Sequence, residues 1–108
     1  MLISDKEIKD AAIAVMSGIC KFRYGTNEIL VIDMMYKGKV HWEATIEFVG
    51  SGFKKAIGRV YTDGFLADEA EFKNCKMNGM LRCYDVCGKV WYEGKIKNDI
   101  LIWERRYV

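Results

Sequence analysis

Two stretches in the second half of the chain resemble each other, and this near-repeat constrains the fold more than any other feature. Each stretch carries a tyrosine, a turn glycine and then an asparagine. Equivalent positions lie 23 or 24 residues apart: Tyr61 and Tyr84, Gly64 and Gly88, Asn74 and Asn98. Each stretch is typical of a strand, a tight glycine turn and a second strand. Repetition at a fixed spacing therefore predicts successive hairpins that stack side by side.

The second stretch resembles the MORN repeat (membrane occupation and recognition nexus), with the best match over residues 82–99. It carries the features of that repeat in order: Tyr84, Gly88, Tyr92-Glu93-Gly94 and Asn98. The first stretch departs from the pattern, since Ala70-Glu71-Phe72 stands where Tyr-Glu-Gly is expected, and the resemblance covers at most residues 55–108. It implies a curled antiparallel sheet in a family whose repeats act as scaffolds for proteins or membrane surfaces. An ordinary antiparallel meander with aromatic strands and glycine turns would give a similar pattern.

A helix is predicted for residues 4–18. Ser4 and Glu7 have the spacing of a capping box, in which each side chain bonds the backbone N–H of the other residue. Gly18 is a candidate stop signal. One apolar stripe follows the helical period: Ile8, Ala11, Ala12, Val15, Met16 and Ile19. We expect this helix to cover one face or end of a sheet.

From Ile19 onward, the chain is typical of short strands joined by turn signals. Residues 39–49 alternate between apolar and polar side chains, which predicts one buried and one wet face. By contrast, residues 29–32 and 100–103 are continuously apolar, and we expect strands covered on both faces. The fold class is α+β: a single domain, residues 1–108, with an N-terminal helix followed by a twisted antiparallel β-meander of about seven strands.

Composition excludes several classes of protein. The 108 residues are 51% hydrophobic and 30% charged, with a formal net charge of +2. This charge is too small to indicate a nucleic-acid partner, and we interpret the basic residues as scattered over solvated faces. The first 20 residues include Asp5, Glu7 and Asp10, unlike a secretory signal, and no segment is long enough to span a membrane. We therefore expect a cytoplasmic protein with neither a nucleic-acid nor a membrane partner.

The cysteines and the single histidine are the candidates for chemistry. In a cytoplasmic protein the four cysteines are expected to be reduced thiols, with Cys20 facing inward on a strand together with Phe22 and Tyr24. Cys75, Cys83 and Cys87 could bind zinc with His41 as a fourth ligand, but no Cys-x-x-Cys pair is present. Cys83 and Cys87 flank a predicted hairpin turn, which explains their proximity without a metal. We predict no metal site, no cofactor and no catalytic residue.

Aromatic and acidic residues are the candidates for partner binding. Trp and Tyr are enriched in binding hot spots, and the adjacent Trp91 and Tyr92 should point to opposite faces of one strand. An acidic stretch would suit a basic partner protein. The predicted partner-binding residues are Trp91, Tyr92, Trp42, Asp68, Glu69 and Glu71. An open meander also leaves sheet edges through which two copies could pair as a homodimer.

Three functions remain open from the sequence. The first is a non-enzymatic protein-interaction module that binds a partner through a sheet face or edge. The second is a small inhibitor, such as an immunity or phage anti-defence protein, that blocks a toxin or nuclease. The third is a small hydrolase or nuclease in which His41 and Glu43, two residues apart on one strand face, perform acid–base catalysis.

Overall fold

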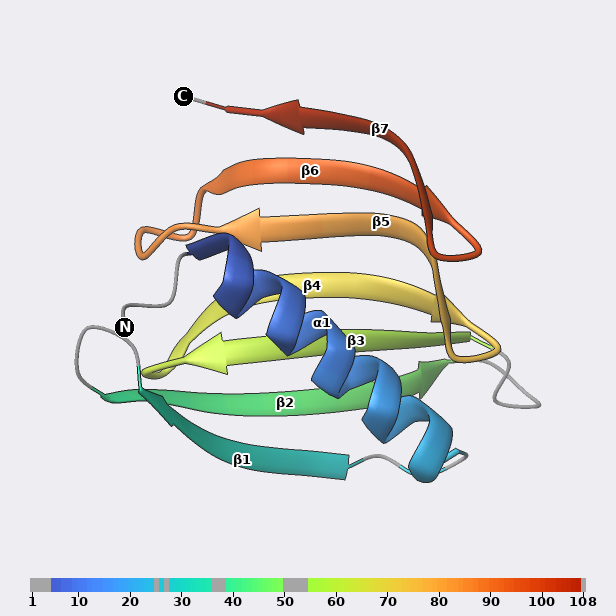
Figure 1. Ribbon diagram of the computed structural model, residues 1–108, viewed down its shortest axis with the longest axis horizontal. Helices are drawn as coiled ribbons and strands as arrows, with labels where there is room; N and C mark the ends of the chain where they lie inside the picture. The colour runs from blue at the N-terminus through green and yellow to red at the C-terminus, as the bar shows by residue number, and fades with distance from the viewer. Residues whose placement is uncertain (1–4, 25, 27, 36–38, 50–54, 108) are drawn as a thin grey trace.

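The computed structural model describes residues 5–107 except 25, 27, 36–38 and 50–54. In this part of the chain, one helix, α1 (Asp5–Phe22), precedes seven strands. The strands are β1 (Glu28–Met35), β2 (Lys39–Val49), β3 (Lys55–Thr62), β4 (Phe65–Lys73), β5 (Lys76–Tyr84), β6 (Val90–Lys97) and β7 (Ile100–Arg106). They form one sheet in chain order, and each strand pairs antiparallel with the next (Figure 1). The predicted α+β arrangement of a helix and an antiparallel meander is confirmed.

Helix α1 crosses one face of the sheet and packs over β2, β3 and β4 (Figure 1). We call this the helix face and the opposite side the open face. Along α1, Ala12, Met16 and Cys20 recur every four residues and are almost fully buried. The sheet contributes the other side of the core, with Trp42, Ala44, Ile46, Val60, Ala70 and Phe72. None of the helices in the described residues is long and apolar enough to cross a membrane.

The sequence predicted that the helix stops at Gly18, but in the structure it continues to Phe22. Gly18 is exposed on α1, where a glycine lowers helix stability by about 1 kcal/mol without ending the helix. The added turn changes the structure around Cys20. This residue lies on the helix, not on a strand, and its burial against the sheet comes from the helical period.

Cys20 forms a disulfide with Cys75, so the prediction of four reduced thiols is wrong. Cys75 is the second residue of the β4–β5 turn, and both turn residues have positive φ (Asn74, 53°; Cys75, 61°), as in a type I′ hairpin. The disulfide fastens the end of α1 to this turn. Disulfides are unusual in cytoplasmic proteins, and the cytoplasmic location stays a prediction.

The two continuously apolar runs are not both enclosed. Val31 on β1 is 55% exposed, and all seven residues of β7 are exposed. The prediction of strands covered on both faces is therefore wrong for Val31 and for β7. The reason is the placement of α1, which lies over the middle of the sheet and leaves the last strand without a covering layer.

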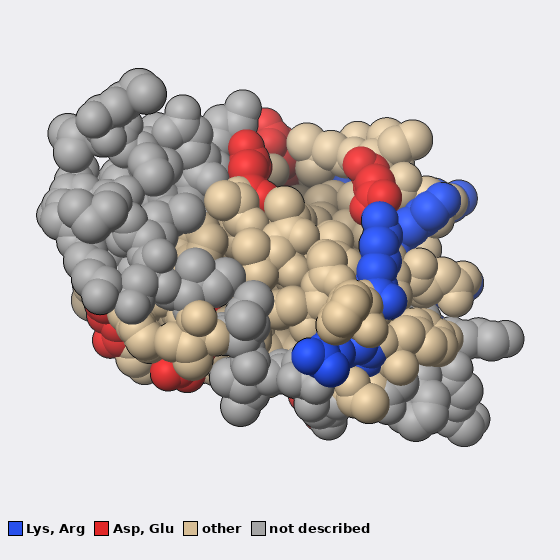
Figure 2. All heavy atoms as spheres, turned by 60° about the horizontal axis from the view of Figure 1, so that its bottom comes forward, with Lys and Arg blue, Asp and Glu red and all other residues tan. Residues whose placement is uncertain are grey.

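Lys and Arg side chains gather toward one end of the surface shown in Figure 2, whereas Asp and Glu are spread more widely. Figure 1 shows that the β4–β5 and β6–β7 hairpins turn at this same end, where α1 also finishes. On this face, the described Lys and Arg side chains are therefore more concentrated than the sequence interpretation allowed.

Gly58 of β3 lies directly beneath α1 and predicts a stability effect. A Cβ atom at this position would lie 2.6 Å from Met16 Sδ and 2.9 Å from Phe72 Cε2. We expect Gly58→Ala to lower the free energy of unfolding by about 1–3 kcal/mol, because these buried neighbours must shift. Urea denaturation measures this effect, with Gly18→Ala as the control. A Cβ atom at Gly18 would meet open space, so this substitution should stabilise the protein by about 0.5–1 kcal/mol. Equal effects of the two substitutions would contradict the packing of α1 on β3.

Candidate binding surface at the β7 edge

Strand β7 is an edge strand with apolar side chains in solvent. Among the described residues it pairs with β6 alone, so one side of its backbone has no strand partner. Ile100 is 66% exposed and Ile102 is 57% exposed. Leu101, Trp103 and the following Tyr107 are also exposed. Exposed apolar edge strands are templates for pairing with another chain, and soluble proteins usually protect them.

The β6–β7 hairpin is held firmly to the rest of the sheet. Its turn residues, Asn98 and Asp99, have φ values of 50° and 68°. Asp99 N donates to Met77 O at 2.9 Å, and Met77 N donates to Asp99 Oδ1 at 2.8 Å. At the far end, Tyr107 N donates to Trp91 O at 2.9 Å. The edge is therefore presented by a fixed backbone, which limits the entropy lost when a partner binds.

A hollow of about 550 Å³ adjoins this edge on the helix face. It is lined by Lys9 and Asp10 of α1, by Trp91 and Tyr92 of β6, and by Leu101, Glu104 and Arg106 of β7. Two basic and two acidic residues balance its charge. The hollow lies where α1 no longer covers the sheet, so it offers a pocket for side chains of a segment bound along β7.

Tyr92 is buried beside this hollow. Its hydroxyl donates to Glu104 Oε2 at 2.8 Å, and Lys9 Nζ lies 3.9 Å from the ring centre. Burial raises the pKa of Tyr92 to about 12, and the hydrogen bond to Glu104 adds to this rise. Tyr92 therefore stays a neutral donor at physiological pH and fixes the Glu104 carboxylate at the edge of the hollow.

Strict alternation predicted that Trp91 and Tyr92 point to opposite faces of the strand. The structure shows that they do not. A register shift between Cys83 and Tyr84 leaves Trp91 outside the regular β5–β6 pairing. Both residues line the hollow, and their ring centres lie 5.8 Å apart. Tyr92 is buried and Trp91 is half-buried. The bulge thus places two predicted binding residues at one site.

The other predicted binding residues lie elsewhere. Trp42 is only 1% exposed and belongs to the core. Asp68 is buried on the helix face, whereas Glu69 and Glu71 lie on the open face. There, Arg59 Nε donates to Glu69 Oε2 at 2.9 Å, and Met80 N donates to Glu71 Oε2 at 3.1 Å. The prediction of one acidic binding surface is wrong because alternation divides these residues between the two faces.

Among the described residues, Asp68 is the one charged residue that is buried. Its side chain lies beside the Cys83 thiol. Burial raises the pKa of Asp68 to about 6, although the hydrogen bond from Cys83 and the charge of Lys9 oppose this rise. Burial also raises the pKa of Cys83, and the Asp68 charge adds to the effect. Cys83 is therefore a neutral thiol. The sequence carried a signal for this site, since Asp68 alternates in phase with Ala70 and Phe72.

The raised pKa of Asp68 predicts a pH dependence of stability. Between about pH 4 and 6 the folded protein holds this proton more tightly than the unfolded chain, so stability from this group falls as pH rises. The loss reaches roughly 3 kcal/mol above pH 6. Asp68→Asn should abolish this contribution. Asp63→Asn, at an exposed turn, should leave the dependence of stability on pH as it is in the wild type. Denaturant midpoints across this range check the prediction, and an unchanged slope in Asp68→Asn would contradict it.

His41 and Glu43 meet on β2 as expected from their spacing. His41 Nε2 lies 3.6 Å from Glu43 Oε1, and both side chains are nearly half exposed. Asp63 Oδ1 also accepts a hydrogen bond from His41 N at 3.4 Å. This is a solvated group on the sheet surface. Their use as an acid–base pair, the third alternative from the sequence, is not tested by this geometry.

The cysteines considered for zinc are separated by the fold. Cys75 is bound to Cys20, Cys83 is buried beside Asp68, and Cys87 is exposed in the β5–β6 loop. In the described ranges, no three His, Cys, Asp or Glu side chains gather in a way that could hold a metal ion.

Comparisons with known proteins show a likeness of fold alone. No family model matches the chain, and no curated protein matches it. Two solved structures do: a Staphylococcus aureus TarM mutant in complex with fondaparinux, alpha-GlcNAc-glycerol and UDP, at 14% identity and a TM-score of 0.51, and TarM itself, at 13% and 0.50. Both matches cover 98% of this chain and 20% of the TarM chain. The chain thus spans about a fifth of the length of the structures that it resembles.

Proposed function

We propose that this chain is a non-enzymatic protein-binding module that takes an extended segment of a partner protein along β7. The observation that supports it best is the exposure of all seven β7 residues on an edge strand of the described sheet. In strand addition, backbone hydrogen bonds supply affinity and side-chain pockets supply specificity. The free side of β7 would supply the backbone hydrogen bonds, and the hollow beside Trp91 and Tyr92 would supply the side-chain pocket.

The chemistry of the edge suits a partner segment that is partly apolar. Ile100, Leu101 and Trp103 offer apolar contacts, while Glu104 and Arg106 offer charges of both signs. A bound segment of mixed apolar and polar character would match this pattern. The balanced charge gives no reason to prefer a basic partner over an acidic one.

A pull-down from the native host lysate tests the proposal with three tagged baits. The wild type should retain a stoichiometric partner, or a second copy of itself, through β7. Ile102→Lys should lose that partner, because lysine on an edge strand opposes pairing. Val86→Lys is the matched control, since Val86 is an exposed aliphatic residue in the β5–β6 loop. Equal retention by the wild type and Ile102→Lys would overturn the assignment of β7.

A further inference from the structure

The open face carries its charges in two contrasting arrangements. Across the middle of the sheet, directly opposed residues on five successive strands alternate in sign: Arg59, Glu69, Arg82, Glu93 and Arg105. Arg59 Nε lies 2.9 Å from Glu69 Oε2, and Arg82 Nε lies 3.1 Å from Glu93 Oε2. Cross-strand pairs of opposite charge stabilise a sheet. Four of the five charges in this row, those of Arg59, Glu69, Arg82 and Glu93, are therefore paired within the chain.

Toward the hairpin turns, the charge is of one sign. Lys55 lies directly opposite Lys73, and Lys73 lies directly opposite Lys76. Two more lysines follow on β6. We call the five residues the lysine cluster: Lys55, Lys73, Lys76, Lys95 and Lys97. Within the described part of the chain, none of these amines forms an ion pair. Directly opposed like charges are destabilising, and nothing in the described chain offsets this cost.

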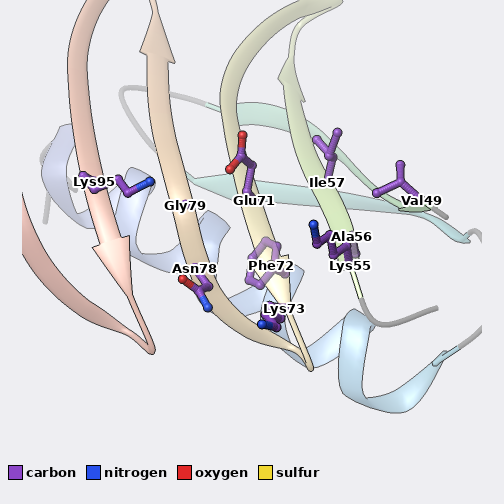
Figure 3. A pocket seen from close by; sticks show the side chains of 10 residues that line it. All are labelled: Val49, Lys55, Ala56, Ile57, Glu71, Phe72, Lys73, Asn78, Gly79 and Lys95. Carbon is purple, nitrogen blue, oxygen red and sulfur yellow. The ribbon is translucent and has the colours of Figure 1, made fainter. Parts of the chain in front are cut away.

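The lysine cluster lines two adjoining hollows. One has a volume of about 480 Å³ and includes Lys55, Lys73 and Lys95 (Figure 3). The other, of about 410 Å³, includes Lys73, Lys76 and Lys97. The hollows share Lys73 and Asn78, so together they run from β3 to the β6–β7 turn. Side-chain amides add hydrogen-bond donors along the way: Asn74, Asn78 and Asn98.

One carboxylate lines this surface, and it is engaged elsewhere. Glu71 Oε2 accepts a hydrogen bond from Met80 N at 3.1 Å, and its side chain packs against Gly79. In Figure 3 the Glu71 carboxylate points away from Lys73, while the Lys95 side chain extends from β6 toward β5. Glu71 keeps its negative charge, but it forms no ion pair with a lysine of the cluster and can offset at most one of the five positive charges.

We propose that the lysine cluster binds a flexible chain of phosphate groups. Lysine amines act as compact point charges that suit phosphate without a fixed orientation. The cluster spans three strand spacings, about 14 Å in total, which is enough for several phosphates in a row. Among the described residues, the two hollows are lined by no exposed aromatic ring. One exposed ring, Trp103, lies opposite Lys95 at the end of the cluster, so a run of nucleic-acid bases would find no row of rings on which to stack. The site therefore favours a phosphate polymer without bases. It adjoins β7, because Lys95 pairs with Trp103 and Lys97 with Ile100, but its ligand differs from the partner segment of the proposed protein-binding function.

Inorganic polyphosphate is the probe for this site. Its binding to the purified protein is measured by isothermal titration calorimetry over a series of salt concentrations. With three or four amines engaged, the logarithm of the binding constant should fall with the logarithm of salt concentration with a slope of about −2 to −3. Lys73→Glu should weaken binding about tenfold or more and flatten this slope. It should also raise the melting temperature, because opposed like charges are replaced by opposite charges.

Lys89→Glu is the matched control, because Lys89 is exposed in the loop at the other end of β5 and the substitution alters net charge equally. Its affinity for polyphosphate should stay within about twofold of the wild type, since it lies outside the cluster. Equal weakening by the two substitutions would overturn the site. The assigned ligand class would be overturned if the protein bound oligo(dT) more tightly than polyphosphate. It would also be overturned if the protein bound anionic phospholipid vesicles but not polyphosphate.

Discussion

Replacing Cys20 with serine is expected to lower the free energy of unfolding by about 4 kcal/mol. The Cys20–Cys75 disulfide closes a sequence separation of 55 residues and so restricts the unfolded chain. The loop-entropy model gives this magnitude for a loop of that length. Domains of this size are stable by only about 5–15 kcal/mol, so the loss is a large share of the total. Chemical denaturation of the wild type and Cys20→Ser under oxidising conditions measures it.

Cys87→Ser provides the control, because Cys87 is an exposed free thiol in the β5–β6 loop. It should leave stability within about 0.5 kcal/mol of the wild type. Reductant should lower the denaturation midpoint of the wild type but not that of Cys20→Ser. If reductant leaves the wild-type midpoint unchanged, the disulfide does not fasten α1 to the β4–β5 turn in solution.

Replacing Trp103 with alanine is expected to weaken partner binding by about 2 kcal/mol, or about 30-fold. Trp103 lies on the proposed binding strand and is 42% exposed, so a partner can bury the rest of its surface. The fold should change little, because the side chain lies at the edge of the sheet and outside the core. Calorimetric titration of the captured partner measures the affinity, and the denaturation midpoint reports on the fold.

Phe22→Ala separates the effect of this site from a general loss of aromatic surface. Phe22 is 79% exposed at the end of α1, away from β7. Its removal should leave partner affinity within about twofold of the wild type, as expected for a residue outside the interface. A loss for Phe22→Ala equal to that for Trp103→Ala would show that β7 is not the binding surface.

Local patterns in the sequence predicted much of this fold. The strand expected at residues 39–49 is β2, and its alternation places Trp42, Ala44 and Ile46 in the core. The near-repeat corresponds to successive hairpins, and its equivalent residues Asn74 and Asn98 begin turns with φ values of 53° and 50°. These features depend on neighbours in sequence, so periodicity and turn chemistry were sufficient. The resemblance to MORN repeats stays a prediction.

Features that depend on distant parts of the chain were not predicted. The apolar run in β7 has the same composition as an enclosed strand, and only the position of α1 shows that it is exposed. The disulfide required Cys20 on a longer helix to reach a turn 55 residues away. The lysine cluster was partly visible, because Lys73 and Lys97 each precede an equivalent turn asparagine. Their assembly into one surface depends on the register of four strands.

Amide hydrogen exchange on the isolated complex tests the role of β7 most directly. Exchange rates are compared for the free protein and for the complex that the wild-type bait captures, including a complex of the chain with itself. A strand added to β7 should slow exchange at alternate amides between Ile100 and Arg106, because only amides on the outer side of the strand gain new acceptors. Protection at β1 or on α1 with unchanged exchange along β7 would contradict the account.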